Sequence, residues 1–194
     1  LAGLEVDFVG VDEIAGGRRQ VDHLVRLGHR RIGILSGPSR SSAVAERVAG
    51  NRAALRGAGL ELPPAWYAEG ALTPEQGYEM GQKVLGQGGP RPTALVCSSD
   101  PIALGAIDAA WDLGLRVPED LAIVGFDDVT PGASRPIQLT TVRAPRAEMG
   151  ALAMNLLLER VQDDRLDARE VILPSELVVR RTCGAPLASP LSQA

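Results

Sequence analysis

Five polar residues of the sequence have the chemistry to hold a small polyhydroxylated molecule. They are Arg47, Ser98, Ser99, Asp100 and Asp127. An arginine supplies a fixed fork of hydrogen-bond donors, and a carboxylate accepts from paired ligand hydroxyls. Simpler roles are open to three of them: Asp100 precedes a proline as a helix N-cap does, Arg47 could be a solvated helix residue, and Asp127 could form a turn. Their shared position at predicted strand ends favours a binding site.

Short apolar runs alternate with helical patterns, and this alternation predicts the elements that place these residues. Strands are expected at residues 6–11, 31–35, 65–69, 93–97, 121–126, 139–142, 171–173 and 177–179. Helices are expected at residues 14–27, 43–56, 74–85, 101–112 and 146–161. Such alternation with short loops predicts an α/β protein with doubly wound parallel sheets. These sheets bind ligands at the carboxyl ends of their strands, where the polar residues lie.

Composition narrows the classes of function. The chain has 194 residues, of which 45% are hydrophobic and 23% charged, as is typical of a globular protein. Its net charge of −4 argues against binding nucleic acid through bulk electrostatics. No apolar run approaches the roughly 20 residues that cross a bilayer, so we expect no membrane partner. Two cysteines cannot form a disulfide framework, and without a Cys/His cluster we expect neither a metal nor a cofactor.

Signatures of catalysis are missing from the sequence. It contains no GxxxxGK[ST], no GxGxxG after a strand, no GxSxG and no HExxH. Cys97 ends a buried strand, where burial raises the pKa of a thiol, and no nearby histidine is implied. His23 and His29 are expected to be structural. We therefore expect the protein not to be an enzyme.

Several segments resemble signatures of the LacI/GalR family of transcriptional regulators. The most specific match is the wording GLRVPED followed by VGFDD, and the resemblance covers about residues 6–182. The matching segments are residues 21–38 (with HLxxxGHRRI), 47–50 (RxxG), 91–105 (RPTA…DxxAxG), 114–120, 124–128 and 139–142.

The resemblance implies a two-lobed, type I periplasmic-binding-protein-like domain, which binds a small molecule, usually a sugar or nucleoside, between its lobes. Residues 1–13 and 139–173 would be the remnant of an N-terminal lobe, which we expect to be incomplete. Residues 14–138 and 174–183 would form the C-terminal lobe, and residues 184–194 a flexible tail. The DNA-binding helix-turn-helix that begins these regulators is expected to be absent from this chain.

The resemblance also implies which residues bind the ligand. They are Arg47, Asp127, Ser99, Leu72, Arg146, Ala43 and Phe126. Leu72 and Ala43 stand where family members often carry an aromatic and a polar side chain, so these sides of the pocket are expected to be less polar. Arg146 can line the cleft from the other lobe, and its charge beside that of Arg47 leaves room for an anionic ligand such as a sugar phosphate.

The function predicted in this way is that of a cytoplasmic effector-sensing domain, in which a small sugar-like molecule controls DNA binding without catalysis. Operator DNA would be bound by a segment outside the chain. A homodimer is expected, through the helix that carries Ile102, Leu104 and Ile107. The alternative is a solute-binding protein of a sugar ABC transporter, and an enzyme is the least favoured class.

Overall fold

The chain folds into two compact units. The computed structural model describes residues 6–162, 165 and 167–185. The larger unit consists of Glu13–Arg143 with the residues from Leu177 onward, and the smaller unit of the residues up to Asp12 with Ala144–Glu176. Every strand pair with a defined register is parallel, as the alternation of strands and helices predicts.

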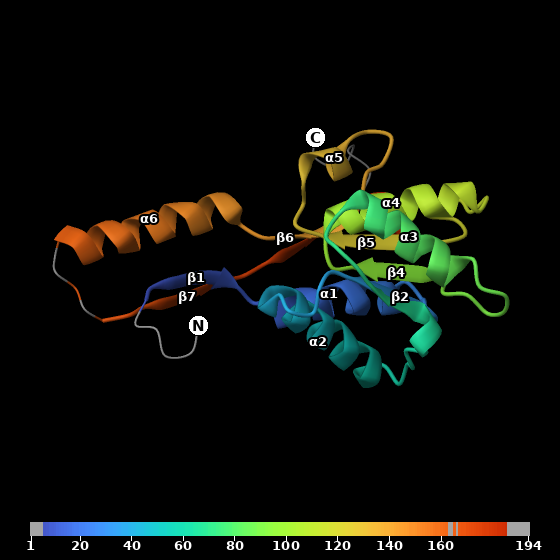
Figure 1. Ribbon diagram of the computed structural model, residues 1–194, viewed down its shortest axis with the longest axis horizontal. Helices are drawn as coiled ribbons and strands as arrows, with labels where there is room; N and C mark the ends of the chain where they lie inside the picture. Colours follow the sequence, from blue (N-terminus) through green and yellow to red (C-terminus); the bar gives the residue numbers. More distant parts are fainter. Residues whose placement is uncertain (1–5, 163–164, 166, 186–194) are drawn as a thin grey trace, which may run out of the picture. The chain divides into compact units, whose positions relative to one another are not determined.

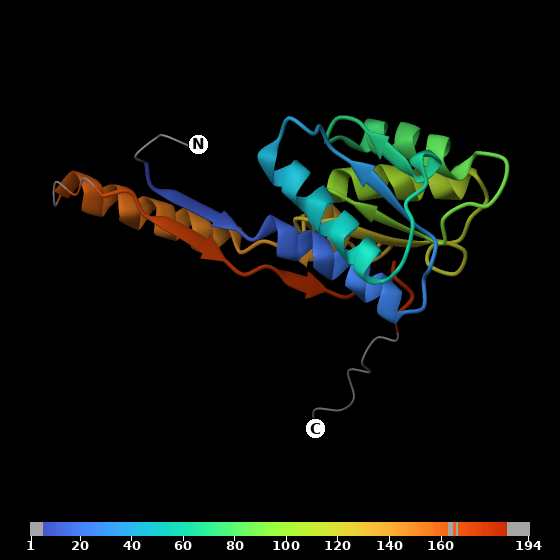
Figure 2. The same cartoon turned by 90° about the horizontal axis from the view of Figure 1, so that it is seen from below.

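The larger unit is built on a six-stranded sheet with the order β3-β2-β4-β5-β6-β8. Its strands are β2 (Ile32–Ser36), β3 (Tyr67–Glu69), β4 (Ala94–Cys97), β5 (Ala122–Phe126), β6 (Thr140–Arg143) and β8 (Glu176–Val178). Its helices are α1 (Glu13–Arg26), α2 (Ser42–Gly57), the 3₁₀ turn η1 (Pro64–Trp66), α3 (Pro74–Leu85), α4 (Asp100–Asp112) and the short α5 (Thr130–Ala133). In Figures 1 and 2, α1 and α2 cover one face of the sheet, whereas α3 and α4 cover the other.

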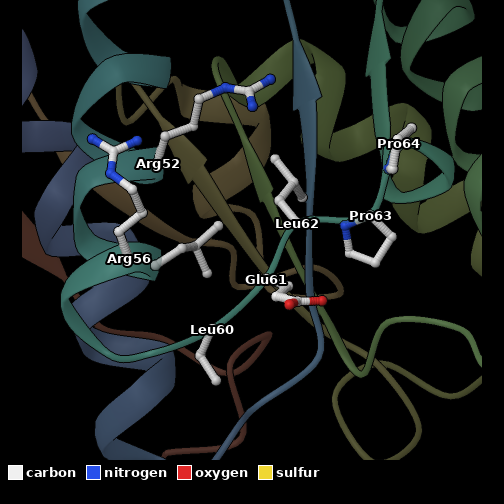
Figure 3. Close-up of a pocket in the computed structure, with 8 residues that line it drawn as sticks. Arg52, Arg56, Leu60, Glu61, Leu62, Pro63 and Pro64 are labelled. Atoms are coloured by element: carbon white, nitrogen blue, oxygen red, sulfur yellow. The ribbon is translucent and has the colours of Figure 1, made fainter.

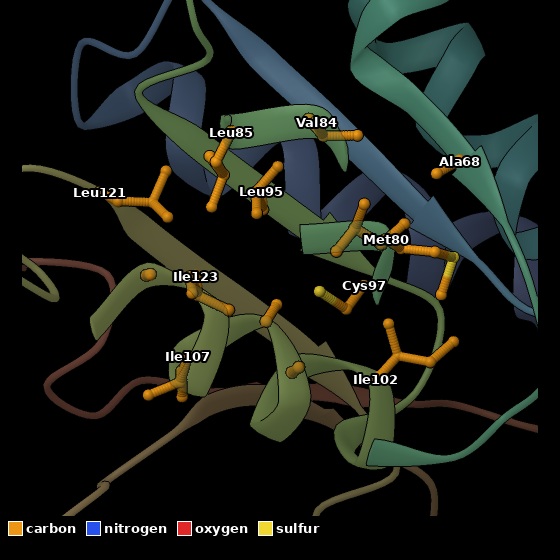
Figure 4. Close-up of a cluster of buried hydrophobic side chains, with 14 of the residues drawn as sticks. Ala68, Met80, Val84, Leu85, Leu95, Cys97, Ile102, Ile107, Leu121 and Ile123 are labelled. Atoms are coloured by element: carbon orange, nitrogen blue, oxygen red, sulfur yellow. The ribbon is translucent and has the colours of Figure 1, made fainter. Parts of the chain in front are cut away.

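Two apolar cores lie on opposite faces of this sheet, because successive side chains of a strand point in opposite directions. In β4, Ala94 and Val96 belong to the core under α1 and α2, whereas Leu95 and Cys97 belong to the core under α3 and α4. Figure 4 shows the second of these cores. Both are filled mainly with aliphatic side chains, as expected for a chain with only 3% aromatic residues.

Glycines let the helices on each face approach backbone to backbone. A Cβ atom at Gly17 of α1 would lie 2.1 Å from the carbonyl oxygen of Arg47 in α2, and one at Gly50 would lie 2.1 Å from that of Ile14. Gly105 allows the same approach of α4 to α3. The close packing of α1 against α2 places Arg47 beside the start of α1.

Buried amide side chains connect these helices to the ends of the central strands. Gln20 is fully buried, and its Nε2 donates to the carbonyl oxygens of Cys97 (2.9 Å) and Gly125 (2.8 Å). Asn51 Nδ2 donates to the Oε1 of Gln20 (3.0 Å) and to the carbonyl oxygen of Gly17 (2.8 Å). Because a buried polar group must be paired, these four bonds help to fix α1 and α2 over β4 and β5.

The smaller unit contains the parallel pair β1 (Phe8–Val11) and β7 (Glu170–Leu173), with α6 (Arg146–Gln162) packed against β1. Asp7 is its main ionic anchor. The carboxylate accepts from Arg165 Nη2 (2.6 Å) and from the backbone amide of Arg169 (2.9 Å). These bonds, above all the one from Arg165, lower the pKa of Asp7.

The unit boundaries differ from those expected from the sequence. Residues 139–143 were assigned to the N-terminal lobe, but β6 pairs in register with β5, which places it in the larger unit. Glu13 likewise belongs to the larger unit. Pro174–Glu176 belong to the smaller, although Glu176 is also the first residue of β8, so the boundary falls inside this strand. In the expected flexible tail, Ala185 packs against the core under α1 and α2, and residues 186–194 lie outside the described residues. Within the described ranges, no helix combines the length and the apolar character that a membrane crossing needs.

The close packing of α3 and α4 leads to a testable prediction for Gly105. A Cβ atom there would lie 1.9 Å from the carbonyl oxygen of Pro74, so we expect Gly105→Ala to lower the free energy of unfolding by about 1–3 kcal/mol or more. At Gly57, in the last turn of α2, an added Cβ meets nothing within 4 Å. Gly57→Ala should therefore be neutral or stabilise by up to about 1 kcal/mol. Urea denaturation measures both variants, and equal effects would contradict the packing described.

Candidate functional site

Arg47 lies at the centre of the polar residues that follow the strands of the larger unit. It lies in the second turn of α2, and only 9% of its surface is exposed. Its Nε and Nη2 donate to the two carboxylate oxygens of Glu13, the first residue of α1, at 2.6 and 3.1 Å. Its Nη1 donates to the carbonyl oxygen of Ser98, just beyond β4, at 2.7 Å. The guanidinium group is thus fixed by a helix start and by a strand end.

Phe126 and Asp127 complete the surroundings of this guanidinium group. The Cζ of Arg47 lies 3.8 Å from the centroid of the Phe126 ring, a cation–π contact at the end of β5. Asp127 follows directly, and its Oδ1 lies 3.6 Å from Arg47 Nη2. The backbone φ of Asp127 is 107°, an unusual conformation for a residue with a side chain, and it persists only where the surroundings impose it.

Ser99 presents a buried hydroxyl group that has no hydrogen-bond partner among the described residues. Only 2% of the residue is exposed, and its Oγ, although at the N-cap of α4, makes no capping bond. Its neighbour Ser98 differs, because the Oγ of Ser98 accepts from the amide of Gly37 at 2.7 Å. Since buried polar atoms are nearly always paired, the Ser99 hydroxyl is free to form a hydrogen bond with a further group.

Asp100 fastens the loop after β5 instead of capping its own helix. Its carboxylate accepts from the Thr141 hydroxyl at 2.6 Å and from the backbone amide of Val129 at 2.8 Å. The residue is completely buried, and burial raises the pKa of this carboxyl to about 6 despite the two donors. Asp100 thus lies at the strand ends, as the sequence predicts, but the predicted N-cap role is wrong because Ser99 holds the N-cap position of α4.

Asp128 joins the same loop to two later segments of the larger unit. Its carboxylate accepts from Arg143 Nε and from Arg180 Nη2, each at 2.6 Å. Arg143 is the last residue of the larger unit before the chain enters the smaller one, and Arg180 follows the return of the chain. Burial raises the pKa of Asp128, but the two arginines together outweigh this effect and leave the pKa below its ordinary value. Like Asp127, it has a positive φ, of 55°.

The remaining residues predicted for the site lie as follows. Leu72 is 42% exposed, and its side chain is close to Gly37 at the end of β2, where a Cβ would lie 2.3 Å from Leu72 Cδ2. Ala43 is half-buried in the first turn of α2. Arg146 is the exposed first residue of α6 and belongs to the smaller unit.

Glu13 is the site residue that sequence reasoning missed. It follows the strand that ends at Val11, so the rule that selected the other residues at strand ends would also have selected it. Thr141, Arg143 and Arg180 gave no such signal, because their bonds depend on which strands become neighbours in the sheet.

The described residues give no structural support for metal or thiol chemistry. Within them, no group of three or more His, Cys, Asp or Glu side chains could hold a metal ion. Cys97 and Cys183 are both buried, and burial raises the pKa of the Cys97 thiol far above its ordinary value. Thiol nucleophiles need the opposite shift.

One hollow of the larger unit lies beside the second half of α2. It has a volume of about 610 Å³ and lies between the second half of α2 and the segment that leads through η1 into β3 (Figure 3). Its lining residues are Arg52, Leu55, Arg56, Leu60, Glu61, Leu62, Pro63 and Pro64. None of the predicted ligand-binding residues lines this hollow.

The fold agrees with a family that the sequence also matches. Residues 21–183 match the family described as "Periplasmic binding protein-like domain", and the chain belongs to that family. Regulators of this family confirm the resemblance to the LacI/GalR family. Solved structures of such regulators confirm the predicted α/β fold with parallel sheets.

The relatives are transcriptional regulators. The chain is 37% identical over 176 residues to the "HTH-type transcriptional repressor PurR" of Salmonella newport (strain SL254), an alignment that covers 91% of this chain and 51% of the relative. The chain thus spans about half the length of the curated relatives that it matches. Among solved structures, it is similar to the "transcriptional regulator CelR-cellobiose complex" (TM-score 0.86, 33% identity, 93% of this chain and 56% of that chain). A LacI-family regulatory protein from Chloroflexus aggregans is similar as well (TM-score 0.85, 34% identity, 94% and 65%). None of these relatives is named as an enzyme.

The buried carboxyl of Asp100 leads to a prediction for the pH dependence of stability. Its pKa of about 6 lies above the ordinary value of 3.8, so the folded chain holds this proton more tightly than the unfolded chain. The stability from this group is therefore complete below about pH 4 and is lost as the pH rises through about 6. Asp100→Asn cannot ionise. Between pH 4 and 7, its free energy of unfolding should gain up to about 3 kcal/mol relative to the wild type.

Urea denaturation at a series of pH values measures this difference, and other titrating groups cancel in the comparison. Asp108→Asn, on the exposed side of the same helix, is the matched control and should follow the wild-type curve. Parallel curves for the wild type and Asp100→Asn would show that Asp100 titrates in the folded chain as it does in the unfolded one.

Proposed function

We propose that this chain is the effector-sensing domain of a LacI-type transcriptional regulator, and that it binds a small sugar-like molecule at the carboxyl end of the larger unit's sheet. One observation carries the proposal: the Ser99 hydroxyl is buried without a partner at the strand ends where Arg47, Phe126 and Asp127 meet. Such a site has donors, acceptors and an apolar face, as a ring with several hydroxyls requires.

Each residue has a distinct role in this proposal. Asp127 accepts hydrogen bonds from ligand hydroxyls, because a carboxylate has two oxygens available for such bonds. Ser99 donates or accepts through its unpaired hydroxyl. Arg47 offers its remaining N–H groups, held in place by Glu13 and Ser98. Leu72 and Ala43 give the site its less polar sides.

The route from ligand to regulation runs through the Asp127–Asp128 pair. Asp127 contacts Arg47 in the site, and Asp128 is bonded to Arg143 and Arg180, which flank the passages of the chain into and out of the smaller unit. We propose that ligand binding favours one arrangement of these passages. In the complete protein, this changes the affinity of a DNA-binding segment for its operator in the cytoplasm. A transporter-associated solute-binding protein is less well supported, because the relatives named above are regulators.

We also propose that the protein is a homodimer, through the helix expected from the sequence. Ile102 and Ile107 of α4 are buried in the chain's own core (Figure 4), so other residues of this helix would make the contact. The outer face of the same helix carries the half-buried Leu104 and Trp111, of which 51% is exposed. Exposed tryptophans of this kind are often energetic centres of interfaces.

Binding measurements test the site. We expect a thermal-shift screen across neutral sugars and nucleosides, with cellobiose among them, to find a molecule that stabilises the chain. Arg47→Ala and Asp127→Ala should each weaken its binding at least about tenfold, and Ser99→Ala about five- to tenfold, as lost polar contacts do. Arg52 is another arginine of α2, and its guanidinium lies over the Tyr67 ring. Arg52→Ala is the control and should leave the affinity unchanged. Unchanged binding in both Arg47→Ala and Asp127→Ala would reject the site.

Light scattering after size-exclusion chromatography tests the dimer. Trp111→Lys should raise the dissociation constant of the dimer at least about tenfold, because it places a charge in the proposed apolar contact. Ala45→Lys makes the same change of charge at an exposed position of α2 and should leave the dimer intact. A wild-type chain that remains a monomer at all concentrations would contradict the proposal.

A further inference from the structure

The positive charge of Arg47 is compensated within the chain, without any ligand. The Glu13 carboxylate grips the Nε and Nη2 edge of the guanidinium at 2.6 and 3.1 Å, and the Asp127 carboxylate lies 3.6 Å from Nη2. The side chains of Arg47 and Glu13 are only 11% and 12% exposed. With both carboxylates ionised, the three side chains carry a net charge of −1.

The hydrogen-bond donors of Arg47 are also largely used. A guanidinium has about five N–H groups, of which Glu13 takes two and the Ser98 carbonyl a third. Of the remaining N–H groups, the one on Nη2 is nearest to Asp127. The Phe126 ring covers one face of the guanidinium plane. The edge that would bind a phosphate or carboxylate through two parallel hydrogen bonds is already taken by Glu13.

Other charges near the strand ends do not restore a positive site. Asp128 is bonded to both Arg143 and Arg180, and these three side chains together carry one positive charge, which offsets the negative charge around Arg47. Asp100 adds a buried carboxyl bonded to Thr141 and Val129. The three arginines and three ionised carboxylates at these strand ends (Arg47, Arg143, Arg180, Glu13, Asp127 and Asp128) sum to zero, so they present no net positive charge to an approaching anion.

We propose that Glu13 determines the charge class of the ligand, so that the site binds uncharged polyhydroxylated molecules and excludes phosphorylated or acidic ones. An anionic group at Asp127 would meet a like charge at short range in a weakly solvated site, where repulsion is strong. The sequence left an anionic ligand open because it contains Arg47 and Arg146. Glu13 removes the contribution of Arg47. This inference rests on the proposed function and adds the ligand's charge to it.

A purely structural role for Glu13 makes a different prediction. If the ion pair only stabilised the start of α1 against α2, its removal would lower stability without changing the response to anions. If Glu13 sets charge selectivity, its removal frees two donors of Arg47 and makes the site an anion acceptor. The response to an anion therefore separates the two roles.

The experiment measures thermal stability with inorganic phosphate as the probe, against sodium chloride at the same ionic strength. The wild type should show no phosphate-specific shift. Glu13→Gln keeps the size of the side chain and removes its charge, so this variant should be stabilised by phosphate, with an apparent affinity at least about tenfold above that of the wild type. Glu13→Asp retains the charge and is the matched control, which should behave like the wild type. The double variant Glu13→Gln/Arg47→Gln should lose the gain.

Two results would overturn the proposal. One is a phosphate-specific stabilisation of the wild type that disappears in Arg47→Gln. The other is a folded Glu13→Gln protein, judged by its circular dichroism, that gains no phosphate binding. If Glu13→Gln does not fold, Glu13→Asn provides the same neutral substitution in a shorter side chain, and the same two outcomes decide.

Failure of this inference can be distinguished from failure of the proposed function. A wild-type chain that binds none of the neutral sugars or nucleosides, while Glu13→Gln gains phosphate binding through Arg47, keeps the charge selectivity and rejects the sugar-like ligand. A wild-type chain that binds a sugar phosphate through Arg47 more tightly than the parent sugar keeps the sensor function and rejects the charge selectivity.

Discussion

The ion pair between Glu13 and Arg47 fixes the geometry of the site, because neither side chain could be buried at this point without the other. Each charge is largely withdrawn from water, and breaking a pair of this kind commonly costs about 3–5 kcal/mol. The pair forms only because Gly17 and Gly50 let α1 and α2 touch through their backbones. The contacts of Arg47 with Ser98, Phe126 and Asp127 all depend on this anchor. A helix–helix packing requirement and a binding requirement are therefore met by the same few residues.

Two adjacent carboxylates at the end of β5 contact different arginines. Asp127 lies beside the guanidinium group of Arg47, whereas Asp128 accepts hydrogen bonds from Arg143 and Arg180. Successive residues can point to such different partners because both have a positive φ, which turns the chain sharply after the strand. This conformation costs roughly 1–3 kcal/mol per residue. The Arg143, Arg180 and Asp100 bonds around the loop supply the surroundings that maintain it.

Much of the fold could be predicted from the sequence because its signals are local. The apolar runs at β2, β4 and β5 and the Thr73–Pro74 start of α3 follow from periodicity and capping alone. The unit to which β6 belongs could not be predicted, because Thr140–Arg143 is an extended segment whose place depends on its pairing with β5. The strand-end rule found Arg47, Ser99 and Asp127. It could not reveal that Asp100 binds Thr141, or that Glu13 pairs with Arg47, because both depend on side-chain directions set by packing between distant segments.

The burial of both cysteines has a practical consequence for following motion in this protein. Cys97 lies inside the sheet with a thiol that stays protonated, and Cys183 is enclosed beside Thr140. Because thiol-reactive dyes attack exposed thiolates, the folded native chain should remain essentially unlabelled. A single cysteine introduced on the surface of either unit would then carry a fluorophore selectively, without prior removal of the natural cysteines. The natural cysteines can therefore stay in place while a fluorophore at the introduced cysteine reports the response to a ligand.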